Sequence, residues 1–142
     1  MSEFRSTLDL RLVCHWANDG RGEWEFIGEL RYYSDMLKME TTIPVGFRYD
    51  KASVPRLPVA FALFGERYAR SAGIHDWYCR NGAIPRKVAD KLFLEAMRVE
   101  NKEEITALIE SGATEEEVQA RRDGLEGQAR AMYAGVRVGS AF

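Results

Sequence analysis

A histidine followed directly by an aspartate, His75-Asp76, is the pair in this chain whose residue types best suit chemistry. The reference pKa of histidine lies near neutral pH, so the side chain can accept and return a proton there. A second aspartate, Asp90, lies on the far side of the turn signal Asn81-Gly82. Because a carboxylate behind an imidazole fixes its tautomer and raises its basicity, His75 and Asp90 are a candidate proton-accepting pair.

Two helices must bring this pair together. The spacing of apolar residues predicts one helix over residues 66–79 and another over 85–99, with the glycine of Asn81-Gly82 ending the first. His75 lies seven residues before that glycine and Asp90 lies eight after it. At ~1.5 Å per residue, both side chains lie roughly 10–12 Å from the turn. We therefore expect them to be level if the helices form an antiparallel hairpin.

The remaining elements predict an α+β fold, in which a small antiparallel sheet precedes a helical half. Alternating apolar residues and turn signals predict strands over residues 6–15, 24–33, 36–42 and 43–49. Helical spacing predicts further helices over residues 102–110 and from Thr114 onward. We expect the last helix to break near Gly124 and Gly127, because glycine weakens a helix interior.

Length and composition indicate one domain over residues 1–142, with a β-rich part (1–49), a loop with a short helix (50–65) and a helical part (66–142). The formal net charge of −2 gives no general attraction to nucleic acid, and none is expected as a partner. No apolar run is long enough to span a bilayer, and two cysteines are too few for a disulfide scaffold. We expect a cytoplasmic, reduced protein, and the sequence leaves its oligomeric state open.

The residues around the candidate pair resemble the catalytic helices of bacterial and fungal phospholipase A2 enzymes. His75-Asp76, Arg80-Asn81, Asp90 and Phe93 match that family's His-Asp-x-x-Tyr-Arg-Asn stretch and its later Asp-x-x-Phe helix. The segment 50–55, Asp-Lys-Ala-Ser-Val-Pro, is similar to the family's calcium loop. The resemblance therefore implies a calcium-dependent acyl-ester hydrolase acting on a lipid or another small anionic ligand.

By this resemblance, His75 is the general base, Asp90 orients it, and Asp50 and Asp76 are calcium ligands. The ion would polarise an ester carbonyl while the histidine deprotonates water. Candidate substrate-binding residues are Ser53, Arg56 and Arg70. The chain departs from the family in two ways: Cys79 replaces the expected tyrosine, with Tyr78 displaced by one, and the two crosslinking cysteines are replaced by Ala52 and Ala72.

A resemblance over more of the chain is to the domain of unknown function 1353 family, whose members are common in tailed bacteriophages and prophages. It is carried by five segments of the sequence: Ile43-Pro44-Val45-Gly46-Phe47, Asp50-x-Ala52-Ser53-Val54-Pro55-Arg56, His75-Asp76, Ala89-Asp90 and Met132-Tyr133-x-x-Val136-Arg137. This similarity implies a phage or prophage origin, and a location in the infected host's cytoplasm or in the virion. It implies no particular activity.

Each candidate site residue also has a structural interpretation. Asp76 can pair with Arg80 one helical turn later, Asp90 can favour the N-terminal half of its helix, and Asp50 can cap a turn with Ser53. Under those interpretations the chain is a non-catalytic phage accessory protein, either a virion assembly factor or a binder that sequesters a host molecule. The geometry around His75 distinguishes the two functions.

Overall fold

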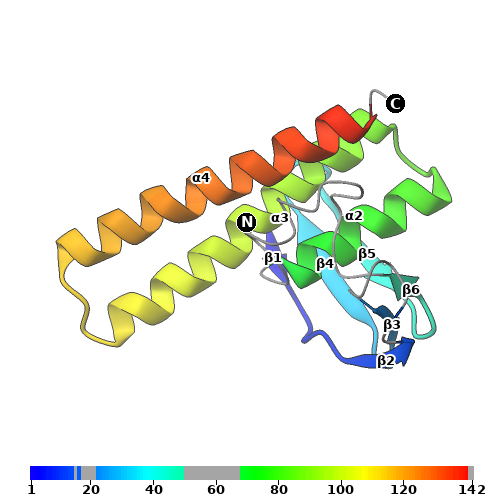
Figure 1. Cartoon of the computed structure of the whole chain (residues 1–142), viewed down its shortest axis with the longest axis horizontal. Coiled ribbons are helices and arrows are strands. Elements are labelled where there is room, and N and C mark those ends of the chain that lie inside the picture. The colour runs from blue at the N-terminus through cyan, green and yellow to red at the C-terminus, as the bar shows by residue number, and fades with distance from the viewer. Residues whose placement is uncertain (15, 17–21, 50–67, 141–142) are drawn as a thin grey trace.

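The computed structural model describes residues 1–14, 16, 22–49 and 68–140 of the chain. Strands come first and helices follow, which confirms the predicted α+β fold (Figure 1). The strands are β1 (Glu3–Phe4), β2 (Leu10–Cys14), β3 (Glu23–Phe26), β4 (Leu30–Ser34), β5 (Met39–Ile43) and β6 (Arg48–Tyr49). The helices are α2 (Ala69–Asn81), α3 (Arg86–Glu110) and α4 (Glu115–Ser140).

The strands form two antiparallel three-stranded sheets, ordered β1-β4-β5 and β2-β3-β6. In β4, Leu30, Tyr32 and Ser34 are buried and alternate with more exposed residues, so this strand turns one face to the core. The predicted single strand over residues 24–33 is wrong, because the chain bends between β3 and β4 and the two strands join different sheets. Gly28 lies in this bend, where an added Cβ would come within 3.0 Å of Asp9.

The other predicted strands exist but are shorter than expected. The segment 6–15 contains β2, and 36–42 overlaps β5. Within 43–49, Ile43 ends β5 and Arg48–Tyr49 form β6. In the segment between β5 and β6, Gly46 has a φ of +98°, an angle that glycine adopts readily and other residues rarely adopt. The chain turns there, which limits β6 to Arg48–Tyr49.

Helix α2 ends where the sequence predicts. Gly82 has a φ of +66°, and its N–H donates to the carbonyl of Tyr78, so it is the left-handed C-cap. Within the helix, Gly73 allows close packing on the strands, since an added Cβ would lie 3.0 Å from Phe26. The Tyr78 hydroxyl lies 2.6 Å from the Thr41 hydroxyl on β5 and fixes the helix against the sheet.

Helices α3 and α4 are longer than predicted. The segments 85–99 and 102–110 join in the single helix α3, which contains neither glycine nor proline. Helix α4 also continues through Gly124 and Gly127, and the expected break is absent. Glycine costs about 0.5–1 kcal/mol relative to alanine inside a helix, and burying apolar side chains outweighs that cost. The buried side chains of α4 are Val118, Leu125, Ala129, Met132 and Val136.

The main core lies between the sheets and the three helices, and the ends of α3 and α4 extend past the strands as a hairpin arm (Figure 1). Residues 102–126, which we call the arm, contain a separate small core of Ile105, Val118 and Leu125. Among the described residues, no helix combines the length and the apolar character needed to cross a membrane.

Candidate functional site

His75 on α2 and Asp90 on α3 meet across the helical hairpin, as their spacing around Gly82 predicts. The Nε2 atom of His75 lies 2.6 Å from Oδ1 of Asp90. If the ring is neutral, Nε2–H donates to the carboxylate and Nδ1 retains its lone pair as an acceptor. This is the tautomer that a base needs in order to take a proton from water.

Two arginines also hold Asp90: Arg86 shares Oδ1 with the histidine, and Arg137 binds the other oxygen. The Nε of Arg86, one turn earlier on α3, donates to Oδ1 of Asp90 at 3.3 Å. Nη1 of Arg137 on α4 donates to Oδ2 at 2.7 Å. Asp90 is fully buried, whereas both arginine side chains are partly exposed. The carboxylate therefore joins all three helices, and its charge is compensated inside the protein.

The imidazole is buried as well, with 3% of the His75 side chain exposed. It packs on the Phe93 ring, with 4.9 Å between the ring centroids. Burial lowers the pKa of His75 below its usual value, and the hydrogen bond to Asp90 opposes that shift only in part. At neutral pH the ring is thus a neutral hydrogen-bonded imidazole.

Cys79 lies one turn after the histidine and does not complete a nucleophilic triad. Its Sγ is 3.5 Å from Nε2 of His75, the same nitrogen that Asp90 contacts. A thiol nucleophile and its orienting carboxylate need opposite ring nitrogens. Burial also raises the pKa of Cys79 to about 11, so the thiol stays protonated at neutral pH.

The same three residues bring metal-ligand atoms within 4.8 Å of one another. However, both carboxylate oxygens of Asp90 accept hydrogen bonds from arginines. A divalent cation at this point would face two guanidinium groups and would need a thiolate that burial opposes. The arrangement suits proton transfer better than metal binding.

Asp76, a predicted calcium ligand, lies on another side of α2 and pairs with Arg80. Its Oδ2 is 3.0 Å from Nη2 of Arg80, the i,i+4 ion pair that the sequence offers as its structural role. Arg80 also donates to the Arg48 carbonyl at 2.7 Å and packs over the Phe47 ring. Asp76 thus already has a cationic partner.

Of the predicted substrate-binding residues, the structure describes Arg70, whose partners are not part of the dyad. Arg70 donates to Glu100 and Glu103 on α3 and lies over the ring of Phe4, so internal partners engage its guanidinium. The predicted calcium ligand Asp50 and the predicted substrate contacts Ser53 and Arg56 lie outside the described residues.

Sequence reasoning missed Arg86 and Arg137 as partners of Asp90. Arg86 had a local signal, because it lies four residues before Asp90 on the same helix. Arg137 is far away in sequence, and only the docking of α4 brings it to the carboxylate. Tyr78, displaced by one from the expected tyrosine, bonds to the sheet instead of to the dyad.

Comparison with known proteins places the chain in a family. The sequence model of a family described as "Protein of unknown function (DUF1353)" matches residues 24–110, which is more than half of the chain and includes both His75 and Asp90. No curated protein and no solved structure matches the chain. On the extent of the family match, the chain belongs to the DUF1353 family of proteins of unknown function.

Proposed function

We propose that this chain is a phospholipase A2-like acyl-ester hydrolase in which His75 activates water. The observation that carries the proposal is the 2.6 Å contact between His75 Nε2 and the buried Asp90 carboxylate. A histidine base needs a partner that fixes its tautomer and stabilises the imidazolium formed during reaction. Asp90 supplies both, and Arg86 and Arg137 keep its oxygens in place.

The proposed chemistry follows from this tautomer. The Nδ1 lone pair accepts a proton from water as the oxygen attacks the ester carbonyl, and the imidazolium then returns that proton to the leaving alkoxide. The lowered pKa of His75 keeps the ring neutral, and therefore able to act as a base, at pH 7. The segment 50–67, with Ser53 and Arg56 as proposed substrate contacts, lies outside the described residues.

Calcium is a separate part of the proposal. When bound, it would stabilise the negative charge that develops on the carbonyl oxygen. Of the two proposed ligands, Asp50 lies outside the described residues and Asp76 pairs with Arg80. Because 53% of the Arg80 side chain is exposed, the guanidinium can move aside and free a carboxylate oxygen. Calcium titration of the wild type and of Asp76→Asn tests this part, and equal calcium affinities of the two would exclude Asp76 as a ligand.

Hydrolysis itself is tested by fatty-acid release from phospholipid vesicles, with and without calcium. We expect the wild type to release fatty acid, and His75→Gln and Asp90→Asn to lose roughly 10²–10⁴-fold in rate. Lys87→Gln, which changes an exposed residue of α3, serves as the control and should retain the wild-type rate. Circular dichroism checks that each variant is folded. Equal release by the wild type and folded His75→Gln would reject the assignment.

Burial of the dyad favours a second candidate, a non-catalytic accessory protein of a tailed phage, acting in the infected host's cytoplasm or in the virion. His75 is 2% exposed, and Asp90 is bonded to three helices, an arrangement that also suits a structural lock. Chemical modification of the native protein with diethylpyrocarbonate distinguishes the two. Rapid modification of His75 supports the hydrolase, whereas a ring that reacts only on unfolding supports the accessory protein.

A further inference from the structure

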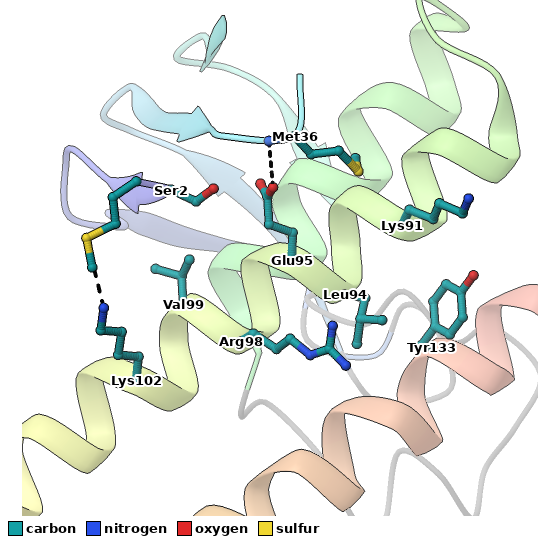
Figure 2. Close-up of a pocket in the computed structure, with 10 residues that line it drawn as sticks. Ser2, Met36, Lys91, Leu94, Glu95, Arg98, Val99, Lys102 and Tyr133 are labelled. Carbon is teal, nitrogen blue, oxygen red and sulfur yellow. Dashed lines mark hydrogen bonds between the residues drawn. The ribbon is translucent and has the colours of Figure 1, made fainter. Parts of the chain in front are cut away.

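A hollow of about 600 Å³ lies along α3, and neither His75 nor Asp90 is among its lining residues (Figure 2). Its walls come from the N-terminal residues, the turn between β4 and β5, one stripe of α3, and Tyr133 of α4. The lining residues are Met1, Ser2, Met36, Lys91, Leu94, Glu95, Arg98, Val99, Lys102 and Tyr133. The volume is within the range of sites that bind small ligands.

Apolar surface predominates in the lining of the hollow. Leu94 and Val99 line it from α3, and Met36 and Tyr133 face it from the β4–β5 turn and from α4. Leu94 and Val99 are half-buried, and 44% of Met36 is exposed. Leu94 and Val99 lie on either side of a row of charged residues of α3, so the apolar strip includes the aliphatic parts of Lys91, Glu95, Arg98 and Lys102. Such a strip suits the tail of an amphiphile.

The charges in the hollow are unequally satisfied. The Glu95 carboxylate accepts hydrogen bonds from the Tyr32 hydroxyl at 2.7 Å and the Met36 N–H at 3.0 Å, so it is directed toward the sheet (Figure 2). Arg98 is paired with Glu126 at 2.6 Å. Lys91 has no carboxylate partner among the described residues, and the Lys102 ammonium lies 3.9 Å from the Met1 sulfur. Two lysine charges are therefore left to attract an anion.

The two lysines lie at opposite ends of the strip. They are eleven residues apart on α3, which corresponds to roughly 16 Å along the helix. Figure 2 shows the Lys91 ammonium and the Tyr133 hydroxyl toward the same end of the hollow, whereas Lys102 is at the other end beside the methionine sulfur. Lys91 and Tyr133 can thus supply an ammonium and a hydroxyl to one oxygen-bearing head group.

We infer that this hollow binds a free long-chain carboxylate, with its head group at Lys91 and its alkyl chain on Leu94, Val99 and Met36. An ammonium and a hydroxyl match a carboxylate head, and the apolar strip that follows matches a single chain. The inference goes beyond the proposed function and does not depend on it, because neither His75 nor Asp90 lines the hollow.

Isothermal titration with sodium dodecanoate below its micelle concentration, using the full chain without calcium, tests the inference. We expect saturable binding to one site, weakened up to about fivefold by Lys91→Gln, since an exposed ion pair contributes about 0.2–1 kcal/mol. Lys87→Gln, on the same helix but outside the hollow, should bind as the wild type does. Met36→Ser should weaken binding of dodecanoate but not of butanoate, because only the longer chain reaches the apolar strip.

Any one of four results would overturn the inference. The first is the absence of saturable dodecanoate binding to the wild type. The second is equal affinity of Lys91→Gln and the wild type for dodecanoate. The third is equal affinity of the wild type for dodecanoate and for dodecyl maltoside, whose head group is neutral. The fourth is association only with phosphatidylglycerol vesicles, which would assign this face to a membrane surface. A wild type that binds dodecanoate but hydrolyses no ester would leave this inference standing and reject only the hydrolase.

Discussion

Asp90 is a single side chain on which the relative positions of three helices depend. It lies on α3, accepts a hydrogen bond from His75 on α2 and another from Arg137 on α4, and pairs with Arg86 on its own helix. The carboxylate has no exposed surface, so water cannot replace a lost partner. Both stability and any reaction of His75 should therefore respond to a change at this residue.

Asp90→Asn should lower the free energy of unfolding by about 2 kcal/mol. The NH₂ group of asparagine would face the N–H donors of His75, Arg86 or Arg137 and would lack an acceptor. Asp123→Asn, an exposed carboxylate of α4 bonded to Gln119, is the control and should leave stability almost unchanged. Urea denaturation followed by circular dichroism measures both. Equal midpoints for the two variants would mean that the Asp90 network contributes little to stability.

The stability of the protein should also depend on the protonation of His75. Burial lowers the pKa of this ring in the folded state, so near and below pH 6.5 the unfolded chain binds the proton more readily. The contribution is fully present above about pH 6.5, the reference pKa of histidine, and is lost as the pH falls through the lowered folded pKa. Urea denaturation of the wild type and His75→Gln between pH 5 and 8 should show a steeper acid loss for the wild type, and parallel curves would contradict this.

The dyad was predictable from sequence, whereas its supporting residues were not. Regular helical rise on both sides of Gly82 places His75 and Asp90 level, so counting residues is sufficient once the turn is identified. Arg137 reaches Asp90 only through the packing of α4, and sequence spacing carries no such information. The ion pair of Asp76 with Arg80 was one of two interpretations, and the sequence alone did not choose between them.

At the scale of elements, tertiary packing decides where the helices and strands end. The fold class and the α2–α3 turn follow from periodicity and a glycine cap, and both predictions are confirmed. The predicted break in α4 fails because intrinsic propensity is weak relative to burial of the face that contains Leu125, Ala129 and Met132. The prediction of one strand over 24–33 is wrong because the alternation of apolar and polar residues continues through both β3 and β4. That pattern does not show that the two strands join different sheets.

The glycines of α4 offer a test of this balance. No atom lies within 4 Å of the position that a Cβ would take at Gly124 or Gly127, and neither residue has a positive φ. Gly124→Ala and Gly127→Ala should each raise the free energy of unfolding by about 0.4–1 kcal/mol, because alanine restricts the unfolded chain.

Gly73→Ala on α2 is the control with the opposite expected sign. The added Cβ would lie 3.0 Å from Phe26, so this substitution should destabilise the protein. Thermal unfolding followed by circular dichroism measures all three variants. Destabilisation by both α4 substitutions would show that these glycines fulfil a requirement other than helix continuity.

At the scale of the whole molecule, the buried apolar residues form two unequal clusters. One lies between the sheets and the proximal parts of the helices, and the arm contains only Ile105, Val118 and Leu125, with Leu108 and Ala113 packed beside them. The base of the arm is fastened where the Leu125 carbonyl accepts hydrogen bonds from Asn101 and Tyr68. Because the distal part of the arm buries little apolar surface, it should open without unfolding the rest.

Native-state hydrogen exchange measured by mass spectrometry tests this independence. Amides of residues 106–122 should open at lower free energy than amides of α2 or of residues 89–97. Val118→Ala truncates a buried side chain of the arm and should accelerate exchange in the arm alone. Leu92→Ala truncates a side chain of the main core and should lower the free energy of unfolding by roughly 2–5 kcal/mol, which would accelerate exchange throughout the chain. If Val118→Ala accelerated exchange equally in α2, the arm and the body would unfold as one cooperative unit, and the His75–Asp90 contact would depend on both clusters.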